Sequence, residues 1–430
     1  MKRRGFTALA MCGAAIVASL LVASAMGAGT KKPAAHVEML GVQASNISTW
    51  NQVLTAMSKQ YAKIVPGSTF KYTYTPQAQL NQKIQLLAGQ NALPLLYNTP
   101  ALDTLTQMNK AGQVVDVAKE FKKLGVTNEL VPAAAAILKK IDGGKILSLP
   151  FEFNIEGVWY NKKLFADNGV AVPKTWDQFV AAAAKLKAAG VQPFAASGIQ
   201  GWPITRLVGN YLFSNLGSNA MENIQSGKAK LTDPQYVAAA QAVADLGSKG
   251  YFGDGVTSLD YTPAEQLFLQ GKAAMFYMGS WILAELNDPK QNQIGLADVG
   301  FFPFPKVAGG KGPATLVPMN AGQTTSISPK KLNAGNEGWL KYYAQHYGDL
   351  AMKLKGQISG FKVHNTPKNL SSATNLVIKQ LAAAKDPVLW FEALFSAKAT
   401  TVAQQDAAPL ATGQMSAQQF MAAVQQAISG

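Results

Sequence analysis

The sequence predicts an α/β protein of two lobes, and three observations support this prediction. The chain has 430 residues, more than one hydrophobic core usually serves. Predicted strands alternate with predicted helices, which is typical of a sheet with crossover connections. Apolar residues make up 48% and charged residues 15% of the chain, which indicates a globular protein and not a disordered one.

The first α/β unit opens with an apolar strand predicted at 37–42. Helices and strands then alternate, beginning with a helix, at 50–61, 70–74, 80–89, 93–97 and 116–123. Because ligands of open α/β sheets bind at the carboxyl ends of the strands, the loop residues Ser45, Asn46 and Asn98 are expected on the rim of a site. Capping of these loops is the alternative role of the three side chains.

Residues 150–190 predict a strand, a short helix, a loop and a longer helix. Polar and apolar residues alternate at the start, which gives an extended segment one polar face made of Glu152, Asn154 and Glu156. Thr175 is the expected N-cap of the longer helix, and Gln178 completes a capping box. Gly190 is the expected end of that helix.

The second α/β unit is expected to extend from residue 150 to about 298. It contains a strand at 193–196, a loop at 197–203 and a helix at 206–213. Later elements are a proline-stiffened segment at 301–305, a strand at 321–327, a helix at 339–350 and a last helix with a capping box at Ser416 and Gln419. Trp390 and Glu392 are expected in the core or at an interface.

Three motifs resemble those of one protein family. They are GVWYNKKLFADNGVAVPKTWDQF at 157–179, FLQGKAAMFYMGSW at 268–281 and, more weakly, LATGQMS at 410–416. In order and spacing they resemble the extracellular sugar-binding proteins that feed ABC importers, the group that includes maltose-binding protein. The resemblance implies an α/β, two-lobe periplasmic-binding-protein fold (type II, maltose-binding-like) with hinge crossings between the lobes.

The resemblance also implies the boundaries of the lobes. Crossings between the lobes are expected near 150–156, 299–305 and 352–359. The N-terminal lobe then comprises residues 37–149 plus 303–352, and the C-terminal lobe comprises residues 150–302 plus 353–430.

Sugars are held by aromatic faces that cover their C–H patches and by polar groups that pair with their hydroxyls. Trp281 resembles the family's ring-stacking tryptophan; the alternative is a core tryptophan at a helix start. Trp202 and Gln200 lie in a loop where the family often places an aromatic residue against the sugar. Asn154 stands where the maltose-binding relative has a cleft carboxylate, which argues against a maltodextrin ligand. Glu152 is expected to bind the ligand or to form a hinge ion pair.

Catalysis and metal binding find no support in the sequence. The three histidines, His36, His346 and His364, have no nearby ligand partners at metal-binding spacing. Glu152 and Glu156 on one strand face would have backbones about 13 Å apart, which is wide for the carboxyl pair of a glycoside hydrolase. No catalytic residue, metal or cofactor is therefore expected.

The N-terminus has the pattern of a secretory signal peptide. Basic residues precede an apolar run at 8–22, and small residues follow, with cleavage expected between Ala25 and Gly27. Residues 1–25 are thus the expected signal peptide and 26–36 a flexible lead; an uncleaved membrane anchor is the alternative. Met11 stands before the single cysteine, Cys12, which disfavours a lipoprotein and favours a periplasmic protein without disulfides.

The distribution of charge along the chain argues against one class of partner, nucleic acids. The formal net charge is +15, but the lysines are spread along the chain, which indicates a solvated basic surface and no nucleic-acid binding. The sequence therefore predicts a secreted monomer that captures a mono- or oligosaccharide between its lobes and delivers it to ABC transporter permease subunits. The alternatives are the same fold binding a polyamine, phosphate ester or other small anion, or a secreted carbohydrate-active enzyme.

Overall fold

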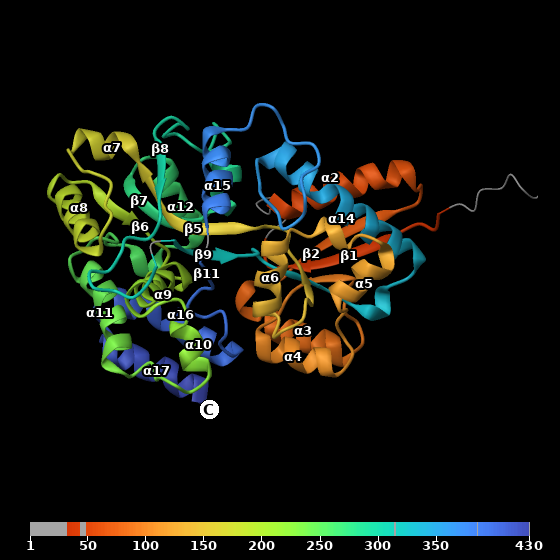
Figure 1. Cartoon of the computed structure of the whole chain (residues 1–430), viewed down its shortest axis with the longest axis horizontal. Coiled ribbons are helices and arrows are strands. Elements are labelled where there is room, and N and C mark those ends of the chain that lie inside the picture. Colours follow the sequence, from red (N-terminus) through yellow and green to blue (C-terminus); the bar gives the residue numbers. More distant parts are fainter. Residues whose placement is uncertain (1–31, 44–48, 314, 385, 430) are drawn as a thin grey trace, which may run out of the picture.

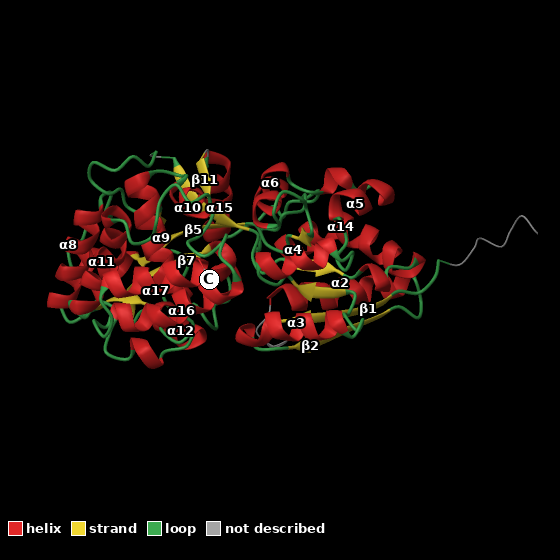
Figure 2. Cartoon of the chain, turned by 90° about the horizontal axis from the view of Figure 1, so that it is seen from below, coloured by secondary structure: helices red, strands yellow, loops and turns green. Residues whose placement is uncertain are grey.

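The computed structural model describes residues 32–43, 49–313, 315–384 and 386–429. These residues form two lobes side by side along the long axis of the molecule, joined by strand β5 and neighbouring segments (Figure 1). Each lobe has its own sheet with helices packed around it (Figure 2). The two-lobed α/β fold predicted from the sequence is confirmed. None of the helices in these ranges is long and apolar enough to cross a membrane.

The first lobe is built on a five-stranded sheet in the order β2-β1-β3-β10-β4. Strands β1, β2 and β3 are parallel, and β10 is antiparallel to β3 and to β4. The strands are β1 (His36–Gly41), β2 (Thr69–Tyr74), β3 (Leu96–Asn98), β4 (Ser148–Leu149) and β10 (Thr325–Ile327). The helices are α2 (Thr49–Ile64), α3 (Leu80–Gly89), α4 (Leu102–Lys110), α5 (Val117–Leu124), α6 (Pro132–Ile141) and α14 (Ala334–Lys355).

The second lobe is built on a sheet in the order β11-β9-β5-β7-β6, with β8 also paired to β5. The strands are β5 (Asn154–Asn161), β6 (Gln192–Ala195), β7 (Ala273–Gly279), β8 (Val299–Phe302), β9 (Leu316–Asn320) and β11 (Asp386–Val388). The helices are α7 (Lys162–Asp167), α8 (Trp176–Ala188), α9 (Trp202–Leu216), α10 (Ala220–Gln225), α11 (Pro234–Ser248), α12 (Tyr261–Leu269), α13 (Leu283–Leu286), α15 (Ser372–Ala383), α16 (Ala397–Ala411) and α17 (Ala417–Ser429).

Local chemistry sets the start of helix α8. The Thr175 hydroxyl accepts a hydrogen bond from the Gln178 backbone N–H, and the Gln178 side chain accepts one from the Thr175 backbone N–H, both at 3.3 Å. These bonds satisfy N–H groups that a helix start leaves unpaired. The predicted capping box is confirmed, and Phe179 on the same helix is fully buried as expected.

The first connection between the two sheets is short. Strand β4 belongs to the first sheet and β5 to the second, so residues 150–153 connect them. Phe151 is fully buried in the first lobe, with its ring 5.9 Å from Trp50, 5.7 Å from Tyr343 and 5.4 Å from Tyr347. This aromatic packing anchors the crossing to helices α2 and α14.

The second crossing differs from the expectation. Residues 299–302 form strand β8, which pairs antiparallel with β5 and stays in the second lobe. Phe301 packs on Trp159 at 5.0 Å and Phe302 on Tyr160 at 5.5 Å, so the aromatic run predicted as a crossing belongs to the second-lobe sheet. Strand β9 also pairs with β5, and the chain returns to the first sheet at 321–324. Residues 303–320 therefore lie with the second sheet, and not with the first lobe as expected.

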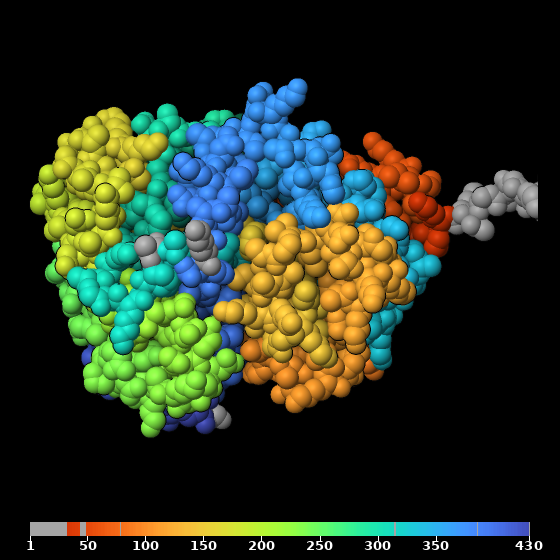
Figure 3. Space-filling model, viewed as in Figure 1, coloured from red at the N-terminus to blue at the C-terminus, as the bar shows by residue number. Residues whose placement is uncertain are grey.

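The segment after α14 contacts both lobes before α15 begins. The Phe153 backbone N–H donates to the carbonyl of Ile358 at 2.9 Å, beside the first crossing. His364 then contacts Glu129 of the first lobe at 2.7 Å, and α15 packs against α13 and β5 of the second. In the space-filling view this stretch fills one edge of the junction (Figure 3). The expected third crossing near 352–359 thus falls in a segment that passes along the junction and returns to the first lobe.

Phe151 tests how strongly the first crossing is anchored. Phe151→Ala is expected to lower the free energy of unfolding by about 3–5 kcal/mol, because it removes a fully buried ring. Urea denaturation followed by circular dichroism measures this change. Ile64→Ala, at a side chain that is 57% exposed, is the control and should change it by less than about 0.5 kcal/mol. Equal effects of the two variants would contradict the anchoring role.

Candidate functional site

Two predicted tryptophans meet on the second lobe. Trp281 lies just after strand β7, and Trp202 begins helix α9. Their rings are 5.8 Å apart at an interplanar angle of 65°, and the ring of Tyr261 stacks on Trp202 at 5.8 Å. We call Trp202, Tyr261 and Trp281 the aromatic cluster; all three side chains are half-buried. Sequence reasoning missed Tyr261, which is the first residue of α12 and carries no distinctive local motif.

Gln200 orients one ring of the cluster. Its side-chain carbonyl accepts a hydrogen bond from the indole N–H of Trp202 at 3.2 Å. Gly201 between them has a φ of +67°, and a Cβ at this position would lie 1.8 Å from the carbonyl oxygen of Gln404. Glycine is therefore required where this loop meets α16. The structure thus brings the predicted residues Gln200 and Trp202 together, and the hydrogen bond from Trp202 to Gln200 fixes the orientation of the indole ring.

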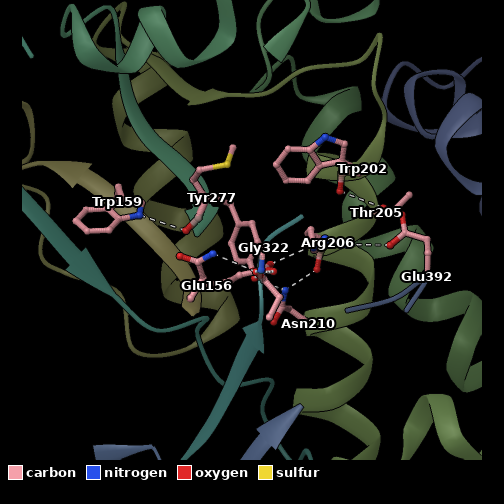
Figure 4. A network of polar contacts seen from close by, with 12 residues as sticks. Glu156, Trp159, Trp202, Thr205, Arg206, Asn210, Tyr277, Gly322 and Glu392 are labelled. Atoms are coloured by element: carbon pink, nitrogen blue, oxygen red, sulfur yellow. Dashed lines mark hydrogen bonds and ion pairs between the residues drawn. The ribbon is translucent and has the colours of Figure 1, made fainter. Parts of the chain in front are cut away.

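Arg206 lies one turn after Trp202 on α9 and faces two indoles. Its guanidinium carbon is 5.4 Å from the ring centroid of Trp202 and 5.1 Å from that of Trp390. The same guanidinium pairs with Glu156 at 3.1 Å and with Glu392 at 3.0 Å (Figure 4). Two carboxylates thus face one cation. The spacing of four residues from Trp202 is the signal that could have pointed to Arg206.

Asn154 lies in a buried polar network between the first and second crossings. Its side-chain N–H donates to Glu152 at 3.1 Å and to Asn320 at 3.2 Å, and its oxygen accepts from the Ser280 hydroxyl at 2.9 Å. Its exposed fraction is 0%, so in this structure the amide pairs with other side chains of the protein and not with solvent. Gly322 also joins the network, since its backbone N–H donates to Asn320 at 2.8 Å.

Glu156 is held at the centre of the same network. It accepts hydrogen bonds from Asn320 at 2.7 Å and from the Tyr277 hydroxyl at 3.2 Å, in addition to its pairing with Arg206. Asn210 in turn donates to the Tyr277 hydroxyl at 2.6 Å (Figure 4). Glu156 therefore connects a strand of the hinge to helix α9.

The first lobe contributes fewer of the expected residues. Asn98 is fully buried; it accepts from the Val42 backbone N–H at 2.9 Å and donates to the Thr325 hydroxyl at 3.2 Å. Asn98 therefore links the ends of β1 and β3 to β10. This contact corresponds to the capping role that was the alternative to ligand binding. Ser45 and Asn46, like the expected signal peptide, lie outside the described residues.

Three carboxyl groups of the second lobe and the first crossing have raised pKa values, and one of them, Glu265, contacts Tyr261 of the aromatic cluster. Desolvation raises the pKa of Glu152 to about 7 and that of Glu285 to about 7. Desolvation, together with the charge of Glu285, also raises the pKa of Glu265 well above its usual range. No group of histidine, cysteine or acidic side chains in the described part of the chain is arranged to hold a metal ion.

A separate depression of about 420 Å³ lies on another face of the second lobe. Helices α8, α9 and α11 line it with Trp176, Tyr211 and Asp245 among others, and none of the predicted site residues takes part. The aromatic cluster is the better candidate, because several indole and amide groups from distant segments converge there.

Comparison with known proteins relates the chain to one family. The family model described as bacterial extracellular solute-binding protein matches residues 43–346. A multiple sugar-binding protein of Streptococcus mutans is 27% identical over 305 residues, covering 67% of this chain and 67% of the relative. An sn-glycerol-3-phosphate-binding periplasmic protein of Rhizobium meliloti is 28% identical over 287 residues, covering 63% of each chain.

Solved structures share the fold. A chitin oligosaccharide binding protein superposes with a TM-score of 0.80 and 26% identity, over 92% of this chain and 100% of that chain.

The curated relatives match only part of this chain. An uncharacterised ABC transporter extracellular-binding protein of Pyrococcus horikoshii is 29% identical over 208 residues, 47% of this chain and 46% of the relative. The chain thus aligns with about half to two thirds of the length of these curated relatives.

The raised pKa of Glu152 predicts a pH-dependent stability. Because the folded-state pKa of about 7 exceeds the ordinary 4.5, the folded protein keeps a proton that the unfolded chain releases, and stability falls as pH rises from about 4.5 to about 7. Glu152→Gln should lessen this loss by about 1–3 kcal/mol.

Denaturation at pH 5 and at pH 8 measures this effect. Glu38→Gln, at an exposed position, is the matched control and should keep the parent's pH dependence. An unchanged dependence in Glu152→Gln would show that the Glu152 carboxyl is not desolvated in solution.

Proposed function

Because the chain belongs to the family of bacterial extracellular solute-binding proteins, we propose that it captures a mono- or oligosaccharide between its lobes and delivers it to an ABC importer. Its partners are the permease subunits of that importer. It acts as a monomer in the periplasm after cleavage of the signal peptide 1–25, without lipidation. The protein binds its solute unchanged and catalyses no reaction.

The aromatic cluster is the observation that best supports a sugar. The half-buried rings of Tyr261 and Trp281 each lie 5.8 Å from the ring of Trp202 on the second lobe. Such rings cover the C–H faces of a pyranose. Relatives named for multiple sugars, for chitin oligosaccharides and for raffinose support the same class of ligand.

The charges at the site favour a neutral ligand over an anion. Relatives that bind sn-glycerol-3-phosphate make a phosphate ester the second candidate. Cationic donors form the strongest hydrogen bonds to phosphate, yet the guanidinium of Arg206 already faces Glu156 and Glu392. The charges of Arg206, Glu156 and Glu392 add up to one negative charge, which opposes binding of an anion beside Arg206.

Binding is proposed to act through closure of the lobes about the crossings at 150–153 and 321–324. Two contacts also bridge the lobes away from these crossings: Lys140 pairs with Glu222 at 3.3 Å, and the Ala397 backbone N–H donates to Asp103 at 3.4 Å. A hinge motion would change both. A ligand shifts the open–closed equilibrium only by its greater affinity for the closed state, which the permease then recognises.

Thermal unfolding of residues 26–430 with a panel of solutes tests the proposal. The panel contains monosaccharides, chito-oligosaccharides, raffinose, stachyose and sn-glycerol 3-phosphate. A saccharide at 100 times its dissociation constant should stabilise the protein by about 2.7 kcal/mol. Trp281→Ala should abolish most of this gain, whereas Tyr342→Ala, on helix α14 of the first lobe, should keep it.

Stabilisation by sn-glycerol 3-phosphate alone would replace the sugar by an anionic ligand. Release of reducing sugar from a bound oligosaccharide would contradict the absence of catalysis.

A further inference from the structure

The hydroxyl of Tyr261 lies between a tryptophan and a buried carboxyl group. It is 3.1 Å from the indole nitrogen of Trp281 and 2.9 Å from a carboxyl oxygen of Glu265. The ring of the same tyrosine stacks on Trp202 at 5.8 Å and 29°. One residue therefore contacts both tryptophans of the aromatic cluster, the first by a hydrogen bond and the second by its ring.

The chemistry of the three groups sets the direction of the hydrogen bonds. An indole N–H only donates, so the tyrosine oxygen must accept from Trp281. The tyrosine hydrogen is then free to donate to Glu265. The bonds thus run in one order, Trp281 to Tyr261 to Glu265, and this order restricts the rotation of both the hydroxyl and the indole.

Glu265 occupies a position where an acidic residue is costly. It lies one turn after Tyr261 on α12 and is 5% exposed, on a helix that also buries Phe268 and Leu269 in the core. A buried carboxyl group lowers stability unless it is hydrogen-bonded. The Tyr261 hydroxyl provides such a hydrogen bond to the Glu265 carboxyl group, and the carboxyl group in turn holds the hydroxyl in place.

We propose that Tyr261 is a positioning residue that holds the indoles of Trp281 and Trp202 at the angle required to stack on a saccharide, and that Glu265 fixes the Tyr261 hydroxyl for this role. The part that concerns saccharide affinity rests on the proposed function. The orientation of Trp281 does not depend on it. Aromatic platforms bind well when their rings are held in place before the ligand arrives.

The substitution Tyr261→Phe tests this directly, because it keeps the stacked ring and removes only the hydroxyl. Tyr236→Phe is the matched control: its buried hydroxyl donates to the carbonyl of Ala220 at 2.8 Å, elsewhere in the same lobe. Tyr261→Phe loses two hydrogen bonds and Tyr236→Phe loses one. Both keep their rings, so a purely structural role would lower the stability of both variants and leave the environment of the Trp281 indole unchanged.

The first readout needs no sugar. In a ¹H–¹⁵N spectrum of the protein labelled with ¹⁵N-tryptophan, Trp281→Phe identifies the indole N–H signal of Trp281. Tyr261→Phe should shift this signal and speed its exchange with solvent, whereas Tyr236→Phe should leave it in place. An unmoved signal in Tyr261→Phe would overturn the proposal whether or not the protein binds sugars.

The second readout is affinity for the panel saccharide that stabilises the parent most. Tyr261→Phe and Glu265→Ala should each weaken binding about tenfold, and Glu265→Gln, which keeps an acceptor oxygen, should restore affinity to near the parent value. Equal affinity in Tyr261→Phe and Tyr236→Phe would overturn the role in binding. If no panel saccharide binds, the proposed function fails, and the Trp281 indole signal still decides whether Tyr261 orients Trp281.

Discussion

The pairing of Asn154 with Asn320 is the contact on which the junction between the lobes depends. The two residues face each other in register where β5 meets β9, and their side chains join at 3.2 Å. Asn320 also donates to Glu156, which holds Arg206, and Arg206 lies over Trp202. A contact between two hinge segments is in this way connected to a ring of the aromatic cluster. Hydrogen bonds, an ion pair and a cation–π contact thus form a continuous connection from the crossing segments to one ring of the aromatic cluster.

The polar character of this junction has a physical reason. The side chains of this junction are buried, and buried polar groups require hydrogen-bond partners. Amide side chains such as Asn154 and Asn320 both donate and accept, so they link carboxylates that would otherwise repel one another. Phe151 secures the first crossing to the first lobe, and Phe301 of β8 packs on Trp159 of β5 within the second lobe.

The site contrasts with the rest of the molecule in charge. The whole chain carries a formal charge of +15, while acidic side chains contact Tyr261 and Arg206 beside the aromatic cluster, namely Glu265, Glu156 and Glu392. Arg206 is fully engaged by two of them. This distribution explains why the net charge is a poor guide to the ligand. The basic residues belong to the solvated surface, and the ligand would meet rings, amides and carboxyl groups.

Local sequence patterns predicted the fold class and many of the elements, but not the strand β8 at Val299–Phe302, and the strand expected at 321–327 is realised only as β10 at Thr325–Ile327. The capping box at Thr175 and the buried aromatic face of α14 follow from hydrogen bonds and apolar spacing within a few residues of one another. The two-lobed architecture was expected from the chain length and from the family resemblance. Trp281 and Trp202 were each expected at the site from the family resemblance, whereas their contact with each other is seen only in the tertiary structure. Only the tertiary structure decided that the crossing lies at 321–324 and that Asn98 ties strand ends together. It also brought Arg206 to Glu392, 186 residues away, and Tyr261 to Trp281. These contacts depend on which strands pair and which helices pack, and side-chain periodicity along the chain carries no information on that choice.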